Sequence, residues 1–169
     1  MTSMILLRIL HVGLGVFWAG TIFFFASYLD SAIRAGLPAS AVVPQYLMQR
    51  KFMIVLPITA LVTILSGLAM YWRDSGGMAS EWTRSHQGLT LGIGGLAGII
   101  AFIIGVGVLR SAQMRMMALG SQMQTAEGAE KERMGGEVAA LRARATGALR
   151  AVAAFLGIAV LSMAVARYV

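Results

Sequence analysis

Residues 88–109 read GLTLGIGGLAGIIAFIIGVGVL, a run of apolar and small residues without a single charge. A helix rises about 1.5 Å per residue, so roughly 20 apolar residues are long enough to cross the hydrocarbon core of a bilayer. Three further stretches of mostly apolar sequence occupy residues 4–28, 52–72 and 146–166. Backbone groups in lipid must be satisfied within the protein, so each stretch is predicted to form a transmembrane helix.

The composition of the whole chain agrees with this prediction. Hydrophobic residues make up 58% of the sequence and charged residues 12%, against about 25% charged residues in soluble domains. We therefore predict an all-α polytopic membrane protein, with residues 1–169 forming a single domain of four transmembrane helices in an antiparallel bundle. The chain has no cysteine, which excludes disulfides, iron–sulfur clusters and thiol catalysis. The first stretch lacks a signal-peptide cleavage pattern, so we expect it to be a retained helix.

The connection between the third and fourth stretches, residues 110–145, is long for a link between bundle helices. Its methionine, valine and leucine residues recur near helical spacing, with charged residues in the gaps. We predict that both helices continue out of the membrane as a cytoplasmic amphipathic hairpin that turns around residues 125–128. Such a hairpin either lies against solvent and lipid head groups or docks a partner subunit.

The distribution of lysine and arginine predicts the orientation of the bundle. The positive-inside rule places the richer side in the cytoplasm. The first and third connections are therefore predicted to be cytoplasmic, and both termini are predicted to face outward across a bacterial inner membrane. The first and third connections with the adjoining start of the fourth stretch hold ten basic residues (Arg34, Arg50, Lys51, Arg110, Arg115, Lys131, Arg133, Arg142, Arg144 and Arg150), and the other side holds four (Arg8, Arg73, Arg84 and Arg167).

The chain has two histidines, His11 near the start of the first stretch and His86 just before the third. The predicted topology puts both at the outer face of the membrane and at similar depth. In a four-helix bundle of this size, two histidines at one end can converge on a single ligand. Imidazole binds haem iron, copper and zinc.

This pairing predicts a b-type haem or porphyrin site near the outer face, with His11 and His86 as ligands. Arg8 or Arg84 would pair with a propionate. Trp18 follows His11 by two helical turns on the same face, which makes it a further contact or a simple packing residue.

Two other interpretations of the histidines stay open. In the first, they hold a metal ion together with Glu81 or Asp74. In the second, each is an interfacial histidine that is hydrogen-bonded to a neighbour or to water.

Other functions are less compatible with the sequence. No Asp, Glu or Lys lies in the middle of any stretch, and such residues are typical of proton relays and ion-coupled transport. A small transporter is therefore a weaker hypothesis than a haem protein or an accessory subunit of a membrane complex. The net charge of +7 is carried mostly by the predicted cytoplasmic loops, where it sets topology, so we expect no nucleic-acid partner.

Several short motifs resemble the HemJ/CopD-like superfamily of small four-helix bacterial membrane proteins. The likeness covers about residues 5–110. It rests on a histidine followed seven residues later by tryptophan and small residues in the first helix, on the entry and body of the second helix, and on the entry to the third. The matching residues are Leu10-His11-Val12, Phe17-Trp18-Ala19-Gly20, Met48-Gln49-Arg50-Lys51-Phe52, Pro57, Gly67 and Trp82-Thr83-Arg84-Ser85-His86.

The resemblance implies a b-type haem and protoporphyrinogen oxidation for HemJ-type relatives, and copper handling for CopD-like ones. It carries the first-helix histidine over to His11. The family's second key residue, a lysine four positions after the tryptophan, is replaced here by His86. This exchange alters charge and ligand character, which leaves haem ligation open and the question of enzymatic activity undecided.

The alternative to a haem protein is a non-catalytic accessory subunit of a larger respiratory or photosynthetic membrane complex. Small residues occur along every predicted span and are densest in residues 88–107. Helices in lipid associate through close packing at such residues. The glycine-rich faces and residues 110–145 would then contact lipid, other membrane subunits or a second copy of the chain.

Overall fold

The computed structural model describes residues 2–36 and 42–169, and every regular element in these ranges is a helix. The prediction of an all-α fold is thus confirmed for the described chain. In order, the elements are α1 (Thr2–Phe24), the π-helical η1 (Phe25–Leu29), α2 (Asp30–Arg34), α3 (Val42–Gln49), α4 (Phe52–Asp74), α5 (Ser80–Thr83), α6 (His86–Ile104), the π-helical η3 (Gly105–Arg110), α7 (Ser111–Gln122), α8 (Gly128–Val165) and the 3₁₀ turn η4 (Ala166–Tyr168).

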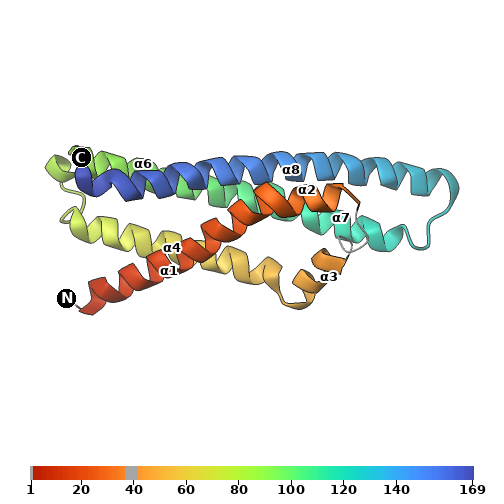
Figure 1. Cartoon of the computed structure of the whole chain (residues 1–169), viewed down its shortest axis with the longest axis horizontal. Coiled ribbons are helices and arrows are strands. Elements are labelled where there is room, and N and C mark those ends of the chain that lie inside the picture. The colour runs from red at the N-terminus through yellow and green to blue at the C-terminus, as the bar shows by residue number, and fades with distance from the viewer. Residues whose placement is uncertain (1, 37–41) are drawn as a thin grey trace.

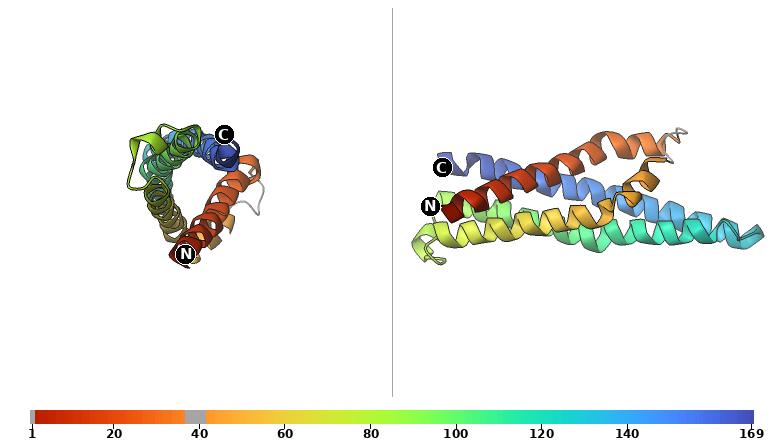
Figure 2. Two further views of the ribbon diagram at one scale, coloured as in Figure 1. Left: turned by 90° about the vertical axis from the view of Figure 1, so that its left-hand side faces the viewer. Right: turned by 90° about the horizontal axis from the view of Figure 1, so that it is seen from below.

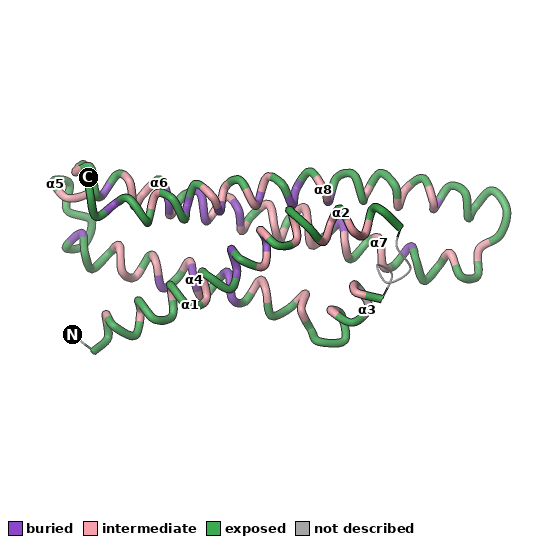
Figure 3. Tube along the Cα trace, in the orientation of Figure 1, coloured by how far each residue is buried: buried purple, intermediate pink, exposed green. Residues whose placement is uncertain are grey.

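Four continuous helical runs are long and apolar enough to cross a membrane, as predicted: Thr2–Arg34, Phe52–Asp74, His86–Gln122 and Gly128–Tyr168. Their outward faces carry large apolar side chains such as Val16, Ile103 and Leu161, each more than 60% exposed. Buried residues lie where the helices face one another, and exposed residues cover the outside (Figure 3). Such an apolar exterior is what a multi-pass membrane protein needs.

The long helices form two closely packed pairs. α1 packs along α4, and α6 packs along α8. α1 starts beside α4 and leans across the molecule until η1 reaches α8 (Figures 1 and 2). Both termini and the α4–α6 connection lie at one end, called here the termini end. The turn between α7 and α8 lies at the opposite, hairpin end (Figure 1).

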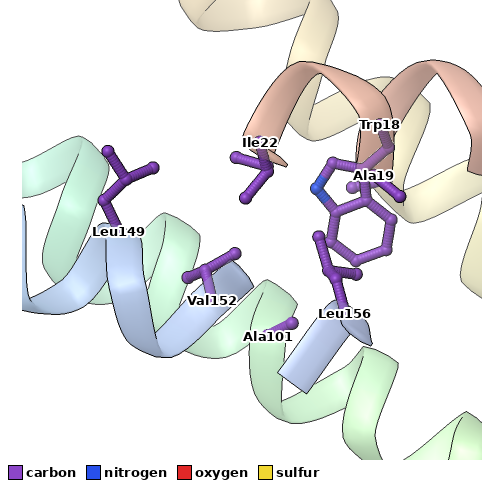
Figure 4. Packing of buried hydrophobic residues seen from close by; sticks show 8 residues of the cluster. Trp18, Ala19, Ile22, Ala101, Leu149, Val152 and Leu156 are labelled. Carbon is purple, nitrogen blue, oxygen red and sulfur yellow. The ribbon is translucent and has the colours of Figure 1, made fainter. Parts of the chain in front are cut away.

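The core lies near the middle of the bundle, where α1 crosses α8. Trp18 and Ile22 of α1 point toward Val152 and Leu156 of α8, with Ala101 of α6 beside them (Figure 4). Trp18 is 5% exposed and Val152 1%. Lipid provides no hydrophobic drive between helices, so this contact depends on close packing of the indole against aliphatic side chains and alanines.

Glycine allows close approach at the termini end. A Cβ on Gly94 of α6 would lie 3.0 Å from Cβ of Ser162 of α8. A Cβ on Gly88 would collide with the backbone oxygen of Trp82, so the tight turn from α5 into α6 requires glycine there. Ser85 caps α6 by accepting a hydrogen bond from the backbone N–H of Gly88 at 3.1 Å.

The first two connections between the long helices contain short helices of their own. The first contains α3, which reverses into α4 through Lys51 in the left-handed region (φ 55°). The second contains the single turn α5. At the hairpin end the chain turns between Gln122 and Gly128, and α8 then runs unbroken for 38 residues. Apolar periodicity does not predict α3 and α5, because both are too short to carry a full helical pattern.

Candidate functional site

His11 lies on α1 at the junction of three helices. Its Nδ1 is 2.8 Å from the backbone oxygen of Thr63 on α4, and its Nε2 is 3.5 Å from Sδ of Met163 on α8. A carbonyl oxygen only accepts hydrogen bonds, so Nδ1 carries the proton and donates it to Thr63. In the neutral ring, Nε2 therefore presents a lone pair toward Met163.

Gly67 of α4 makes room for the imidazole. A Cβ at this position would lie 2.7 Å from Cε1 of His11 and 3.0 Å from Nδ1. Thr63 and Gly67 are one turn apart and face the same helix. Two successive turns of α4 thus contact the imidazole of His11. Thr63 supplies the hydrogen-bond acceptor, and Gly67 supplies the space.

Two further contacts hold α1 in register with α4. Arg73 donates a 2.9 Å hydrogen bond from Nη1 to Oγ of Ser3, near the start of α1. Gly15 lies one turn after His11, and a Cβ there would contact Cγ2 of Thr63 at 3.4 Å. This is an ordinary van der Waals distance, so α1 and α4 lie close together at Gly15 without requiring glycine there.

The contact between His11 and Met163 pairs two electron-pair donors. A thioether sulfur accepts hydrogen bonds only weakly and has no proton to give. With Nδ1 already protonated, the neutral imidazole has no proton to share with Met163 either. Imidazole and thioether are the axial ligands of many cytochrome haems, and soft thioethers also bind Cu(I). Both atoms are therefore of types that ligate metals, and at 3.5 Å they lie in direct contact with each other.

His86 has different surroundings. It is the first residue of α6 and is exposed. Met163, which contacts His11, has its Cγ 3.6 Å from the position of a Cβ on Gly94. Gly94 follows His86 by eight residues, or roughly 12 Å along the helix axis. Both histidines thus belong to the termini end, but His11 lies much deeper in the bundle than His86.

The remaining predicted site residues are dispersed. Arg8 is exposed on α1, one turn before His11, and Arg84 is exposed at the end of α5. Trp18 is buried in the core described above. Within residues 2–36 and 42–169, no group of three His, Cys, Asp or Glu side chains is placed to hold a metal ion. The two histidines with Glu81 or Asp74 do not form such a group.

Sequence reasoning missed Thr63, Gly67 and Met163 as partners of His11. The predicted topology gave a partial signal, because Met163 falls at the same end of its span as His11. It gave no means of choosing which residue of α4 or α8 faces the ring. That choice depends on helix rotation, which apolar spans surrounded by lipid leave undetermined.

Comparison with known proteins finds no matching family model, no matching curated protein and no matching solved structure. The likeness to HemJ/CopD-like proteins therefore rests on the quoted motifs alone.

Proposed function

We propose that the protein binds a b-type haem or a porphyrin inside the membrane, in a redox or porphyrin-related role, with His11 as the ligand. The observation that carries the proposal is the 2.8 Å contact between Nδ1 of His11 and the Thr63 carbonyl. Histidines that ligate metals almost always donate their other ring N–H to such an acceptor, which fixes the ring and its tautomer. His11 thus presents Nε2 as a free electron-pair donor.

The surrounding residues fit this group. Met163 would supply a second ligand, because haem iron accepts thioether sulfur as well as imidazole. Arg8, one turn away on α1, supplies a cation for a propionate. When bound, haem provides a centre that exchanges single electrons. The chain itself holds the imidazole of His11 through the Thr63 carbonyl and leaves space for it at Gly67. It also encloses His11 and Met163 in an apolar junction of helices.

The choice of second ligand distinguishes two forms of the proposal. The sequence pairs His11 with His86, whereas the contact distances favour Met163 because it already faces Nε2. An absorption spectrum of protein extracted from native membranes, oxidised and then reduced with dithionite, tests both forms. A haem spectrum that is lost in His11→Ala supports the proposal. A shift in Met163→Leu with no change in His86→Ala assigns the second ligand to Met163.

A protein that is purified in good yield without a Soret band would overturn the haem proposal. Gly13→Ala is the matched control, because this position is two residues from His11 and nothing lies within 4 Å of an added Cβ. The control should keep the wild-type spectrum.

An accessory subunit of a larger membrane complex is the second candidate function. Gly13 and Gly20 lie seven residues apart on an exposed face of α1, and a Cβ at either position meets nothing within the described chain. Packing inside this protein therefore gives no reason for glycine at these positions. Replacing both with leucine should release co-purifying subunits while leaving the isolated chain folded. Unchanged co-purification would argue against this face as the contact.

A further inference from the structure

A second region of interest lies at the hairpin end, away from His11. A cavity of about 430 Å³ opens between the end of the first helical run, α3, the start of α4, α7 and α8. This volume falls in the range of pockets that bind small ligands. Its wall combines apolar side chains, three charged side chains (Asp30, Arg34 and Arg142) and five methionines. The methionines are Met48, Met53, Met116, Met117 and Met123.

A narrow crevice of about 60 Å³ adjoins this cavity and leads toward the bundle core. Its walls include Trp18, Ala101 and Val152, so its inner end is apolar. Its small volume restricts an occupant to a thin, flexible end. The two spaces are adjacent because they share Phe25, Phe52, Met53, Leu109 and Gln113 as lining residues.

Arg110 lies where the crevice approaches the wide cavity. It lines the crevice, and its immediate neighbour Leu109 lines both spaces. The Nε atom of Arg110 is buried and has no hydrogen-bond partner among the described residues. A buried donor of a charged group without an acceptor is costly. An acidic oxygen in the adjoining space would remove that cost.

The charges on the wide cavity favour an anion. Asp30 is the one acidic residue of its wall, and both of its oxygens are engaged. Oδ2 pairs with Nε of Arg34 at 3.1 Å, and Oδ1 accepts a 3.0 Å hydrogen bond from Thr146. Arg34 is thus compensated within the protein, whereas neither Arg142 in the wall of the wide cavity nor Arg110 in the crevice forms a salt bridge within the described chain.

The position and lining of the cavity indicate a membrane lipid. Arg110 directly follows the apolar stretch 88–109, and Thr146 opens the stretch 146–166, so the cavity lies at the expected edge of the bilayer. Methionine side chains adapt to ligands of irregular or changing shape. Two π-helical segments, η1 and η3, also border the two spaces, and such segments are frequent at functional sites.

We propose that this cavity binds an anionic phospholipid from the adjoining leaflet. Its acidic head group would contact Arg110 and Arg142, and its acyl chain would run along the methionine wall with one end in the crevice. The site is at the opposite end of the bundle from His11, so it does not depend on the haem proposal.

Native mass spectrometry of the full chain in detergent tests this inference. The delipidated protein is titrated with phosphatidylglycerol and with phosphatidylcholine carrying the same acyl chains. We expect phosphatidylglycerol to bind at least about tenfold more tightly, the ratio that corresponds to one charge-assisted hydrogen bond. Arg110→Gln and Arg142→Gln should each weaken phosphatidylglycerol binding by about tenfold. Arg150→Gln is the control, because Arg150 is exposed on α8 and outside the cavity wall.

A second variant tests the acyl-chain part of the site without altering charge. Gly120 lines the cavity, and nothing lies within 4 Å of an added Cβ. Gly120→Leu should therefore fill the space and reduce phosphatidylglycerol binding, whereas Gly136→Leu, outside the wall, should not. Because Arg142 and Gly120 are both exposed, these variants keep the test valid if Arg110→Gln fails to fold.

Three outcomes would overturn the inference. The first is equal binding of the two lipids, and the second is equal loss in Arg142→Gln and Arg150→Gln. The third is displacement of phosphatidylglycerol by millimolar inorganic phosphate, which would identify a soluble anion as the ligand.

Discussion

The imidazole of His11 lies directly against Gly67, so that a methyl group on Gly67 would approach Cε1 to within 2.7 Å. The glycine and the histidine come from different helices and are 56 positions apart in the chain, yet neither can change without affecting the other. His11 is thus packed between helices and hydrogen-bonded to the Thr63 carbonyl.

Gly67→Ala should displace the imidazole and break its hydrogen bond to the Thr63 carbonyl. Overpacking of this kind costs about 1–3 kcal/mol. We expect a lower melting temperature in detergent, together with a loss or shift of any haem spectrum. Gly13→Ala should change neither. If Gly67→Ala matched the wild type in both measurements, the packing of His11 against Gly67 would be contradicted.

Met163→Leu should preserve the fold but remove the sulfur that faces Nε2 of His11. Leucine and methionine exchange at small cost because their volumes are similar. Methionine ligation raises the reduction potential of a haem, so the variant should show a lower midpoint potential and altered reduced bands. Met114→Leu, at an exposed position of α7, is the control. An unchanged potential in Met163→Leu would exclude the sulfur as a ligand.

Trp18→Ala should destabilise the bundle through its core. The indole is 5% exposed and packs where α1 crosses α8, so truncation should cost about 3 kcal/mol. Thermal unfolding of the purified protein measures the loss. Val16→Ala provides the comparison, because Val16 is 68% exposed on the outer face of the same helix and should have little effect. Equal losses in the two variants would contradict the core assignment of Trp18.

The orientation expected from the basic residues can be tested directly, because the chain has no cysteine. Single-cysteine variants Ser80→Cys and Ser121→Cys lie at the termini end and the hairpin end, respectively. A membrane-impermeant thiol reagent added to intact cells should label Ser80→Cys, and Ser121→Cys only after the membrane is opened. The reverse pattern would invert the orientation and place the lipid site in the outer leaflet.

The four apolar helices were predictable because length and absence of charge are sufficient to identify them. Residues 88–109, for example, are long and apolar enough to cross a bilayer. Their pairing was not predictable. Glycine occurs in both α1 and α6, yet Gly94 is needed for packing against α8, whereas Gly13 and Gly20 meet nothing within the described chain.

The candidate site was predictable in part. Topology assigned His11 and His86 to one end of the molecule. The structure agrees, because His86 is the first residue of α6 and His11 contacts Met163 near the end of α8. Their difference in depth could not be derived, because it depends on the sliding of α1 along α4. That position is set by particular contacts, such as the hydrogen bond from Arg73 to Ser3 and the packing of His11 against Gly67, which no sequence pattern marks.

The most direct test of the central claim is the haem content of the protein purified from native membranes, measured as the pyridine haemochrome. We predict close to one haem per chain in the wild type and almost none in His11→Ala purified at equal yield. Wild-type protein without haem, or His11→Ala with full haem content, would contradict the assignment of His11 as the ligand.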